Sequence, residues 1–239
     1  MRFYKNILFT FSAIGLANMA IARDATHYPY DSVTYAGKYL RTITNNITGS
    51  ALALHVDFNF ATDQHQLLKQ AAVTLSERYI SKPVLDCAYA NSVKDLPVSR
   101  EAFISQMKEV MGTKVVEDAH VPTYIFVARY AQDKESVGIG FLNLYYDTDQ
   151  QFPGYSDRHY LYVALNDEFL GKPSYGYGTD AEYWAGVLGH EILHNLNFDH
   201  KTGYSGSFIS EYGKCIWKNG VQSDIPEGSV IDKTVEREM

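Results

Sequence analysis

Alternation of apolar and polar positions, the period of a half-buried β-strand, first occurs in this chain at residues 52–60 and is strict from Leu54 on. Later runs rich in β-branched and aromatic residues are bounded by polar turns that contain Gly, Asp and Gln. Together these patterns predict strands at residues 52–60, 84–90, 124–130, 137–146 and 160–165.

A period of about 3.6 residues predicts amphipathic helices between these strands. Residues 63–79 form the first such stretch, with Asp63 at a capping position. A second stretch covers residues 99–111. The apolar side chains that fall on one face are Leu67, Leu68, Ala71, Ala72, Leu75 and Tyr79 in the first helix, and Phe103, Ile104, Met107, Val110 and Met111 in the second.

A third helix is predicted after residue 180. The sequence Thr179-Asp180-Ala181-Glu182 has the T-x-x-E pattern of a capping box, with Thr179 as the cap. Gly186 and Gly189 each weaken a helix by about 1 kcal/mol relative to Ala. We therefore expect them to permit close packing against a neighbouring element.

In chain order the elements are strand, helix, strand, helix, three strands and helix. This order predicts an α+β fold, in which helices pack against a twisted mixed β-sheet. The 239 residues are enough for one sizeable domain, and no clear linker or repeat divides residues 23–239.

The third helix carries the sequence His190-Glu191-Ile192-Leu193-His194. His190 and His194 are one turn apart and share a face, so their imidazoles can hold one metal ion. Glu191 lies beside them and can reach a water bound to that ion. A third ligand from beyond the helix would complete a catalytic site whose fourth position is left open.

His200, six residues after His194, is the candidate third ligand. It can reach the metal only if the chain turns sharply after the helix. Asn197 can end a helix in the left-handed conformation, because Asn adopts positive φ more readily than other residues with a side chain. We therefore predict a turn at Asn197 that directs His200 toward the other two histidines.

The complete run, H-E-x-x-H-x-x-N-x-x-H, resembles the signature H-E-x-x-H-x-x-G-x-x-H of the metzincin zinc peptidases. His190, Glu191, His194 and His200 match it residue by residue, and Asn197 stands where the family has Gly. The resemblance implies one catalytic Zn²⁺ ion and a protein or peptide substrate. It implies a zinc-dependent endopeptidase in which Glu191 is the general base.

The methionine of the metzincin Met-turn is missing, because no Met lies between His200 and the last residue of the chain. Residues 208–213 resemble the Met-turn segment, with Ile209 or Phe208 as the apolar replacement. By the same resemblance, Tyr212 is a candidate for stabilising the transition state or binding the metal. The alternative for Tyr212 is packing beneath the site.

The order of elements is also similar to that of the upper subdomain of metzincins. The resemblance implies a metzincin-like fold in which the strand at residues 137–146 is the sheet edge that pairs with an extended substrate. It also implies that residues 201–239 form a small C-terminal subdomain.

Two alternatives to this interpretation remain open. Glu211 could supply the third ligand in place of His200, as a downstream Glu does in gluzincin-like peptidases. In the other alternative, the chain is a secreted metal-binding or adhesive protein whose site is catalytically inactive.

The formal net charge of −7 favours neither a nucleic acid nor an anionic membrane surface as partner. We expect a monomer that takes a protein or peptide substrate. Residues 1–22 have a basic start, an apolar stretch and a small-x-small cleavage site, which predict a signal peptide and a secreted protein. The apolar stretch is too short and broken for stable membrane insertion. Residues 23–50 are interpreted as a pro-segment or as a first strand and loop.

Cys87 and Cys215 are the only two cysteines, and an exported protein with an even number of cysteines can form a disulfide. We predict a Cys87–Cys215 disulfide. The alternative is that Cys87 masks the zinc ion in a latent form.

Overall fold

The computed structural model describes residues 52–57, 59–97, 99–111, 114–116, 119–121, 123–130, 137–140 and 160–221. The predicted signal peptide, residues 1–22, and the segment 23–50 lie outside these residues. The described elements, in chain order, are β1 (Leu52–Val56), α2 (Thr62–Arg78), α3 (Lys82–Asn91), α4 (Arg100–Met111), β2 (Lys114–Val116), β3 (Ala119–Val121), β4 (Thr123–Tyr130), β5 (Gly138–Gly140), β6 (Tyr160–Asn166), α6 (Ala181–Asn195) and α7 (Phe208–Trp217).

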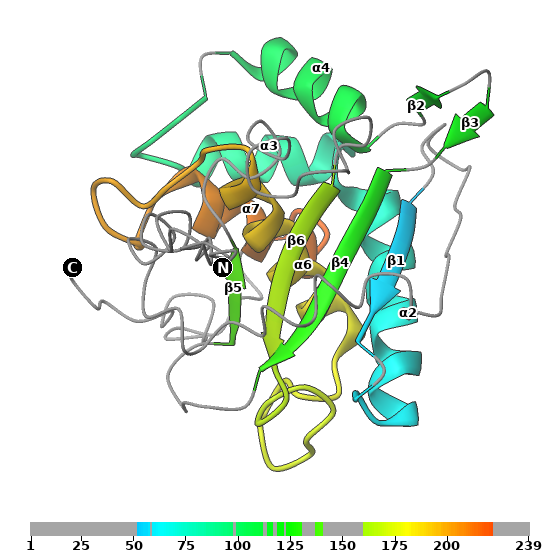
Figure 1. The fold of residues 1–239 in the computed structure, drawn as a ribbon. Helices are drawn as coiled ribbons and strands as arrows, with labels where there is room; N and C mark the ends of the chain where they lie inside the picture. Colours follow the sequence, from blue (N-terminus) through cyan, green and yellow to red (C-terminus); the bar gives the residue numbers. More distant parts are fainter. Residues whose placement is uncertain are drawn as a thin grey trace, which may run out of the picture.

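Four strands form a mixed sheet in the order β1-β4-β6-β5, which confirms a mixed α/β architecture (Figure 1). Strands β1, β4 and β6 are parallel, and β5 runs antiparallel to β6. Strand β5 stands at one edge of this sheet. It confirms residues 138–140 of the strand predicted at 137–146, whereas residues 141–146 lie outside the described part of the chain. A separate antiparallel pair, β2 and β3, was not predicted.

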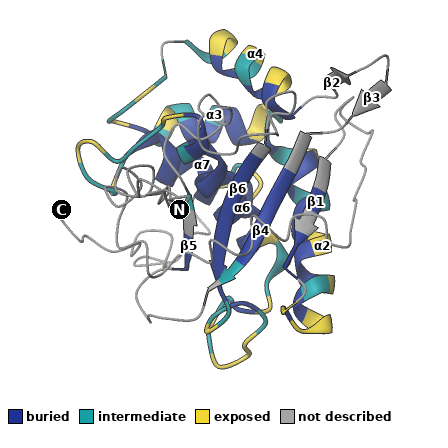
Figure 2. Cartoon of the chain, in the orientation of Figure 1, coloured by how far each residue is buried: buried dark blue, intermediate teal, exposed yellow. Residues whose placement is uncertain are grey.

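The hydrophobic core lies between the sheet and the helices, and α2 and α6 cross behind the strands (Figure 1). The apolar faces predicted for α2 and α4 are buried in this core (Figure 2). No helix in the described part of the chain is both long and apolar enough to cross a membrane. Every second residue along the strands contributes to the same core: Leu54, Val56, Ile125, Val127, Leu161, Val163 and Leu165.

The predicted strand at residues 84–90 is wrong, because this segment lies within helix α3. Pro83 occupies the first turn of the helix, where its missing N–H removes no helical hydrogen bond. Val84, Leu85, Cys87 and Ala88 are buried, which is the spacing of one helical face. A short apolar run fits either a strand or a buried helix, and here packing against α7 decides for the helix.

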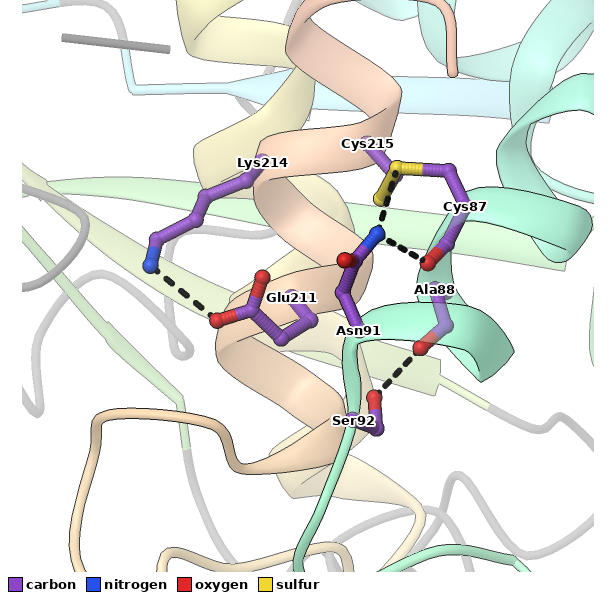
Figure 3. The surroundings of a disulfide bond; sticks show 7 residues. All are labelled: Cys87, Ala88, Asn91, Ser92, Glu211, Lys214 and Cys215. Atoms are coloured by element: carbon purple, nitrogen blue, oxygen red, sulfur yellow. Dashed lines mark hydrogen bonds and ion pairs between the residues drawn. A yellow bond between two sulfur atoms is a disulfide. The ribbon is translucent and has the colours of Figure 1, made fainter. Parts of the chain in front are cut away.

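Helix α7 joins the same hydrophobic core as the sheet and the earlier helices. The described residues 201–221 therefore share this core, and the rest of the predicted C-terminal subdomain, residues 222–239, lies outside the described part of the chain. The predicted disulfide between Cys87 and Cys215 is present and links α3 to α7, with the two Cα atoms 5.9 Å apart (Figure 3). Because Cys87 is disulfide-bonded, the alternative in which it masks a zinc ion is wrong for this state of the chain.

Candidate metal centre

Helix α6 begins at a cap formed by Asp180 and not by Thr179, so the predicted capping box is wrong. Asp180 Oδ1 accepts hydrogen bonds from the backbone N–H groups of Glu182 and Tyr183, at 2.9 and 3.1 Å. Its second oxygen accepts from Trp217 Nε1 at 3.0 Å. The carboxylate therefore caps α6 and also ties it to the end of α7.

The glycines of α6 permit close contact with α7, as predicted. A Cβ atom added to Gly186 would lie 2.5 Å from the carbonyl oxygen of Gly213, and one added to Gly189 would lie 2.5 Å from Cδ1 of Ile216. The contact at Gly186 is with backbone and cannot be relieved by a side chain, so that position requires Gly, whereas a larger residue at position 189 would require the Ile216 side chain to move. The close packing places the backbone of α7 directly beneath His190, whose Cβ would lie 3.2 Å from a Cβ on Gly213.

The helix ends in the turn predicted at Asn197, which has φ of 67°. The N–H of Asn197 bonds to the carbonyl of His194 at 2.9 Å, and the N–H of Phe198 bonds to the carbonyl of Leu193 at 3.0 Å. This pair of bonds is a Schellman motif with Asn in the left-handed position. The turn reverses the chain and brings His200 back to α6.

The three predicted histidines converge, and their ligand atoms all lie within 4.8 Å of one another. His200 Nε2 is 3.2 Å from His190 Nε2. The ring centroids are 5.2 Å apart for His190 and His194, and 5.3 Å apart for His194 and His200. In the described part of the chain, this is the one group of three or more His, Cys, Asp or Glu residues that can hold a metal ion.

The separation of His190 and His200 fits a tetrahedral metal ion. Two nitrogen atoms that are each about 2.0–2.1 Å from a tetrahedral zinc ion lie roughly 3.3 Å from each other. The observed 3.2 Å matches this spacing. Side-chain nitrogens of three imidazoles, with no thiolate among them, also suit zinc or another divalent transition metal.

Hydrogen bonds on the far side of two rings aim their Nε2 atoms at the centre of the group. His194 Nδ1 lies 2.9 Å from the carbonyl oxygen of Phe198, which can only accept. The proton of a neutral His194 is therefore on Nδ1, and Nε2 carries the free electron pair. His200 Nδ1 has a corresponding contact with Ser207 Oγ at 2.9 Å. Outer contacts of this kind are usual for histidines that bind metals.

His190 is the most deeply buried of the three histidines. Burial lowers its pKa well below the ordinary value, and the neighbouring His194 and His200 lower the pKa further. The backbone of Ile209 comes near enough to raise this pKa in part, but among the described residues Nδ1 of His190 has no partner with ordinary hydrogen-bond geometry. A neutral ring is the form that binds a metal ion.

Glu191 is buried beside the histidines, with Oε2 4.0 Å from Nε2 of His194. The edge strand β5 packs against this part of α6. A Cβ atom added to Gly138 would lie 3.0 Å from Oε1 of Glu191, and one added to Gly140 would overlap the Glu191 carbonyl oxygen. Gly138 thus lies against the carboxylate, and Gly140 lies against the backbone of α6 at Glu191.

Tyr212 packs in the core beneath the three histidines, and no contact described for it supports the auxiliary role. Its hydroxyl donates to the carbonyl oxygen of Tyr79 at 2.7 Å, and its ring is fully buried between Phe103 and Phe208. Burial raises the pKa of Tyr212 well above its ordinary value. Its packing role was the alternative given above.

The other residues expected near the site fall into helix α7. Residues 208–213 form its first turns, so the resemblance to a Met-turn fails at the level of backbone conformation. Ile209 and Phe208 are both buried in the core, and the backbone of Ile209 lies near His190. The carboxylate of Glu211 pairs with Lys214 at 3.2 Å and is not in the metal-binding group, so Glu211 is not the third ligand here (Figure 3).

Several residues that shape the site were missed from the sequence. Gly138 and Gly140 looked like ordinary turn or strand glycines, although their G-x-G spacing on a predicted edge strand was a usable signal. Ser207 carried no signal, because its contact with His200 depends on how the loop folds. Asn195 bonds through its side chain to the backbone of Tyr162 in β6, a contact between distant segments that local patterns do not predict.

Comparison with models of known protein families, with curated proteins and with solved structures found no match for this chain. Fold and site together define a class: a mixed α/β protein with a buried group of three histidines that can hold a metal ion.

Proposed function

We propose that this chain is a secreted, zinc-dependent endopeptidase of the metzincin type, with His190, His194 and His200 as metal ligands. One observation carries the proposal: three imidazoles converge on one point, and the Glu191 carboxylate lies beside them on the same helix. A structural metal site is usually closed by four protein ligands. A group of three leaves one position for water or substrate.

The chemistry follows from the residues that surround this point. A zinc ion held by three neutral imidazoles supplies Lewis acidity, which lowers the pKa of water toward about 7 and polarises a carbonyl group. Glu191 acts as the general base: it removes a proton from the attacking water and then delivers that proton to the leaving nitrogen. Burial of Glu191 keeps bulk water away from this transfer.

Strand β5 supports the proposed mode of substrate binding. It is the edge of the described sheet and packs on α6 at Glu191 and His194. An extended peptide added to such an edge forms backbone hydrogen bonds with the strand. A substrate bound along β5 would pass the metal ligands with its backbone in a fixed direction.

Export is supported by two features. The Cys87–Cys215 disulfide is the kind of bond that persists in oxidising compartments. The first 22 residues have the composition of a cleaved signal peptide. We propose that the mature chain is monomeric and acts outside the cytoplasm on proteins or peptides.

The test is metal analysis of the purified mature protein, combined with profiling of its cleavage of a mixed peptide library with and without a chelator. We expect about one zinc ion per chain and cleavage that stops when zinc is removed and returns when zinc is added. Bound zinc without any cleavage would select the inactive metal-binding alternative. Absence of any bound divalent metal would exclude both the zinc endopeptidase and the inactive metal-binding protein.

A further inference from the structure

Ser207 stands at the N-cap of α7, where a serine side chain usually accepts a hydrogen bond from a backbone N–H of the first turn. Its hydroxyl makes no such capping bond. Instead, Ser207 Oγ lies 2.9 Å from Nδ1 of His200. The side chain is fully buried, so this contact is shielded from solvent. The hydroxyl therefore contacts His200 in place of capping α7.

The direction of this hydrogen bond follows from the other partners of the hydroxyl. Ser207 Oγ lies 2.8 Å from the carbonyl oxygen of Tyr204, which can only accept, so the serine proton points there. The two lone pairs of Ser207 Oγ then remain for donors. His200 Nδ1–H, 2.9 Å away, is then the donor to Ser207 Oγ, whereas Ser210 Oγ, 3.1 Å away, is a second acceptor for the serine proton. His200 thus keeps its proton on Nδ1 and directs the lone pair of Nε2 toward His190.

The backbone around Ser207 is fixed from a distant part of the chain. Ser207 forms a parallel bridge with Lys94, in the loop between α3 and α4. The N–H of Phe208 bonds to the carbonyl of Lys94 at 3.1 Å, and the N–H of Lys94 bonds to the carbonyl of Gly206 at 3.1 Å. The ring of Tyr204 also packs on the His200 ring, with centroids 3.8 Å apart. The position of Ser207 is therefore fixed by backbone contacts with the loop between α3 and α4.

We infer that Ser207 is a positioning residue for the metal centre: its hydroxyl selects the Nδ1–H tautomer of His200 and holds the ring so that Nε2 faces the other ligands. This inference rests on the proposed metal-binding function. It extends that function to a residue in the outer layer of the site, where losses of about 10- to 100-fold in metal affinity are typical.

The experiment compares wild type with Ser207→Ala and Ser207→Thr in two measurements. The first is the ¹⁵N spectrum of the histidine rings in the metal-free protein at about pH 8, above the ordinary histidine pKa of about 6.5. We expect the Nδ1–H tautomer for His200 in wild type and Ser207→Thr, and a mixed population in Ser207→Ala. The second is zinc affinity by competition with a chromophoric chelator. We expect Ser207→Ala to bind zinc about 10- to 100-fold more weakly than wild type, and Ser207→Thr to recover most of this loss.

Ser76→Ala is the matched control, because Ser76 is as deeply buried as Ser207 and its hydroxyl donates to the carbonyl of Val73 on α2. This variant should bind zinc like wild type. If Ser207→Ala keeps both the His200 tautomer and the wild-type zinc affinity, the inference is overturned. A loss of zinc affinity no larger than that of Ser76→Ala would also overturn it. If wild type itself binds no zinc, the proposed function fails, and the ring spectra alone still decide the role of Ser207.

Discussion

Asn195 holds both backbone groups of Tyr162. Its Oδ1 accepts the Tyr162 N–H at 2.6 Å, and its Nδ2 donates to the Tyr162 carbonyl oxygen at 3.1 Å. Asn195 directly follows His194 of the three-histidine group, whereas Tyr162 lies in β6, next to the edge strand. The side-chain amide thus ties the C-terminal end of α6 to the sheet. It pairs with the N–H and the carbonyl of Tyr162, as the backbone of a neighbouring strand does.

Asn195→Ala should strongly destabilise the protein. The substitution leaves a buried N–H and a buried carbonyl of Tyr162 without this partner, at a cost of about 1–3 kcal/mol each. The measurement is the free energy of unfolding in urea. Asn91→Ala is the matched control, because Asn91 also ends a helix but bonds through Nδ2 to the Cys87 carbonyl four residues back and is only half-buried. Equal losses in the two variants would contradict the role assigned to Asn195.

Tyr212→Phe should change alkaline stability and leave the metal centre intact. Burial raises the pKa of Tyr212 well above its ordinary value, so the folded state keeps the phenol proton to higher pH than the unfolded state does. Below a pH of about 10 this proton is bound in both the folded and the unfolded state, so the contribution of Tyr212 to the free energy of unfolding is fully present. As pH rises above about 10, the unfolded state loses the proton and the free energy of unfolding falls, by at most about 1.4 kcal/mol per pH unit for this group.

The measurement is urea unfolding between about pH 9 and pH 11.5, a window that begins below the ordinary tyrosine pKa. Tyr212→Phe should show a shallower fall than wild type, although loss of the hydrogen bond to Tyr79 lowers its stability at neutral pH by about 1 kcal/mol. Tyr183 and Tyr175 also have raised pKa values, so the free energy of unfolding of Tyr212→Phe still falls somewhat as pH rises. Loss of zinc binding in Tyr212→Phe would instead support the auxiliary role of Tyr212 at the metal site.

Sequence periodicity was enough to locate α2, α4 and α6 and the strands β1, β4 and β6, because each has one face buried in the core. The convergence of His190, His194 and His200 could also be predicted. The i, i+4 spacing on α6 and the tolerance of Asn197 for positive φ are local properties, and local properties can be read from a sequence.

The failures concern properties that depend on contacts between distant segments. The segment 84–90 is helical because it packs on α7, and its short apolar pattern suits both structures. Tyr212 was placed by analogy with a turn, whereas the segment is helical and directs its hydroxyl to Tyr79. The approach of β5 to Glu191 also could not be predicted, since it depends on the packing of a strand against a helix about 50 residues later, beyond the reach of local patterns.

Removal of the Cys87–Cys215 disulfide should lower the free energy of unfolding by about 4–5 kcal/mol, because the bond closes a long loop and so restricts the unfolded chain. The two cysteines are 128 residues apart. The measurement is urea unfolding of a Cys87→Ala and Cys215→Ala double variant beside wild type. Thiol titration of denatured wild type without reductant is the control. Two reactive thiols there would exclude the disulfide.

Gly140→Ala should disrupt the contact between β5 and α6. The new Cβ would overlap the carbonyl oxygen of Glu191 and lie 2.8 Å from Cβ of His194, and neither atom is the flexible end of a side chain. We expect a loss of about 1–3 kcal/mol in the free energy of unfolding, together with weaker zinc binding. Gly176→Ala is the control, since its Cβ would meet no atom within 4 Å. Wild-type stability in Gly140→Ala would show that β5 does not rest on the helix.

Glu191→Gln tests the proposed chemistry most directly. The amide has nearly the same shape as the carboxylate and fills the same buried space, but it cannot take a proton from water. We therefore expect zinc content close to wild type and peptide cleavage reduced by about 10²- to 10⁴-fold, the usual contribution of a general base. Zinc content is measured on the purified protein, and cleavage on the best peptide found in the library. Glu182→Gln is the control, because Glu182 lies on the same helix with its side chain 54% exposed. Full activity in Glu191→Gln, with the Glu182→Gln control also active, would remove Glu191 from the mechanism while leaving the three histidine ligands in place.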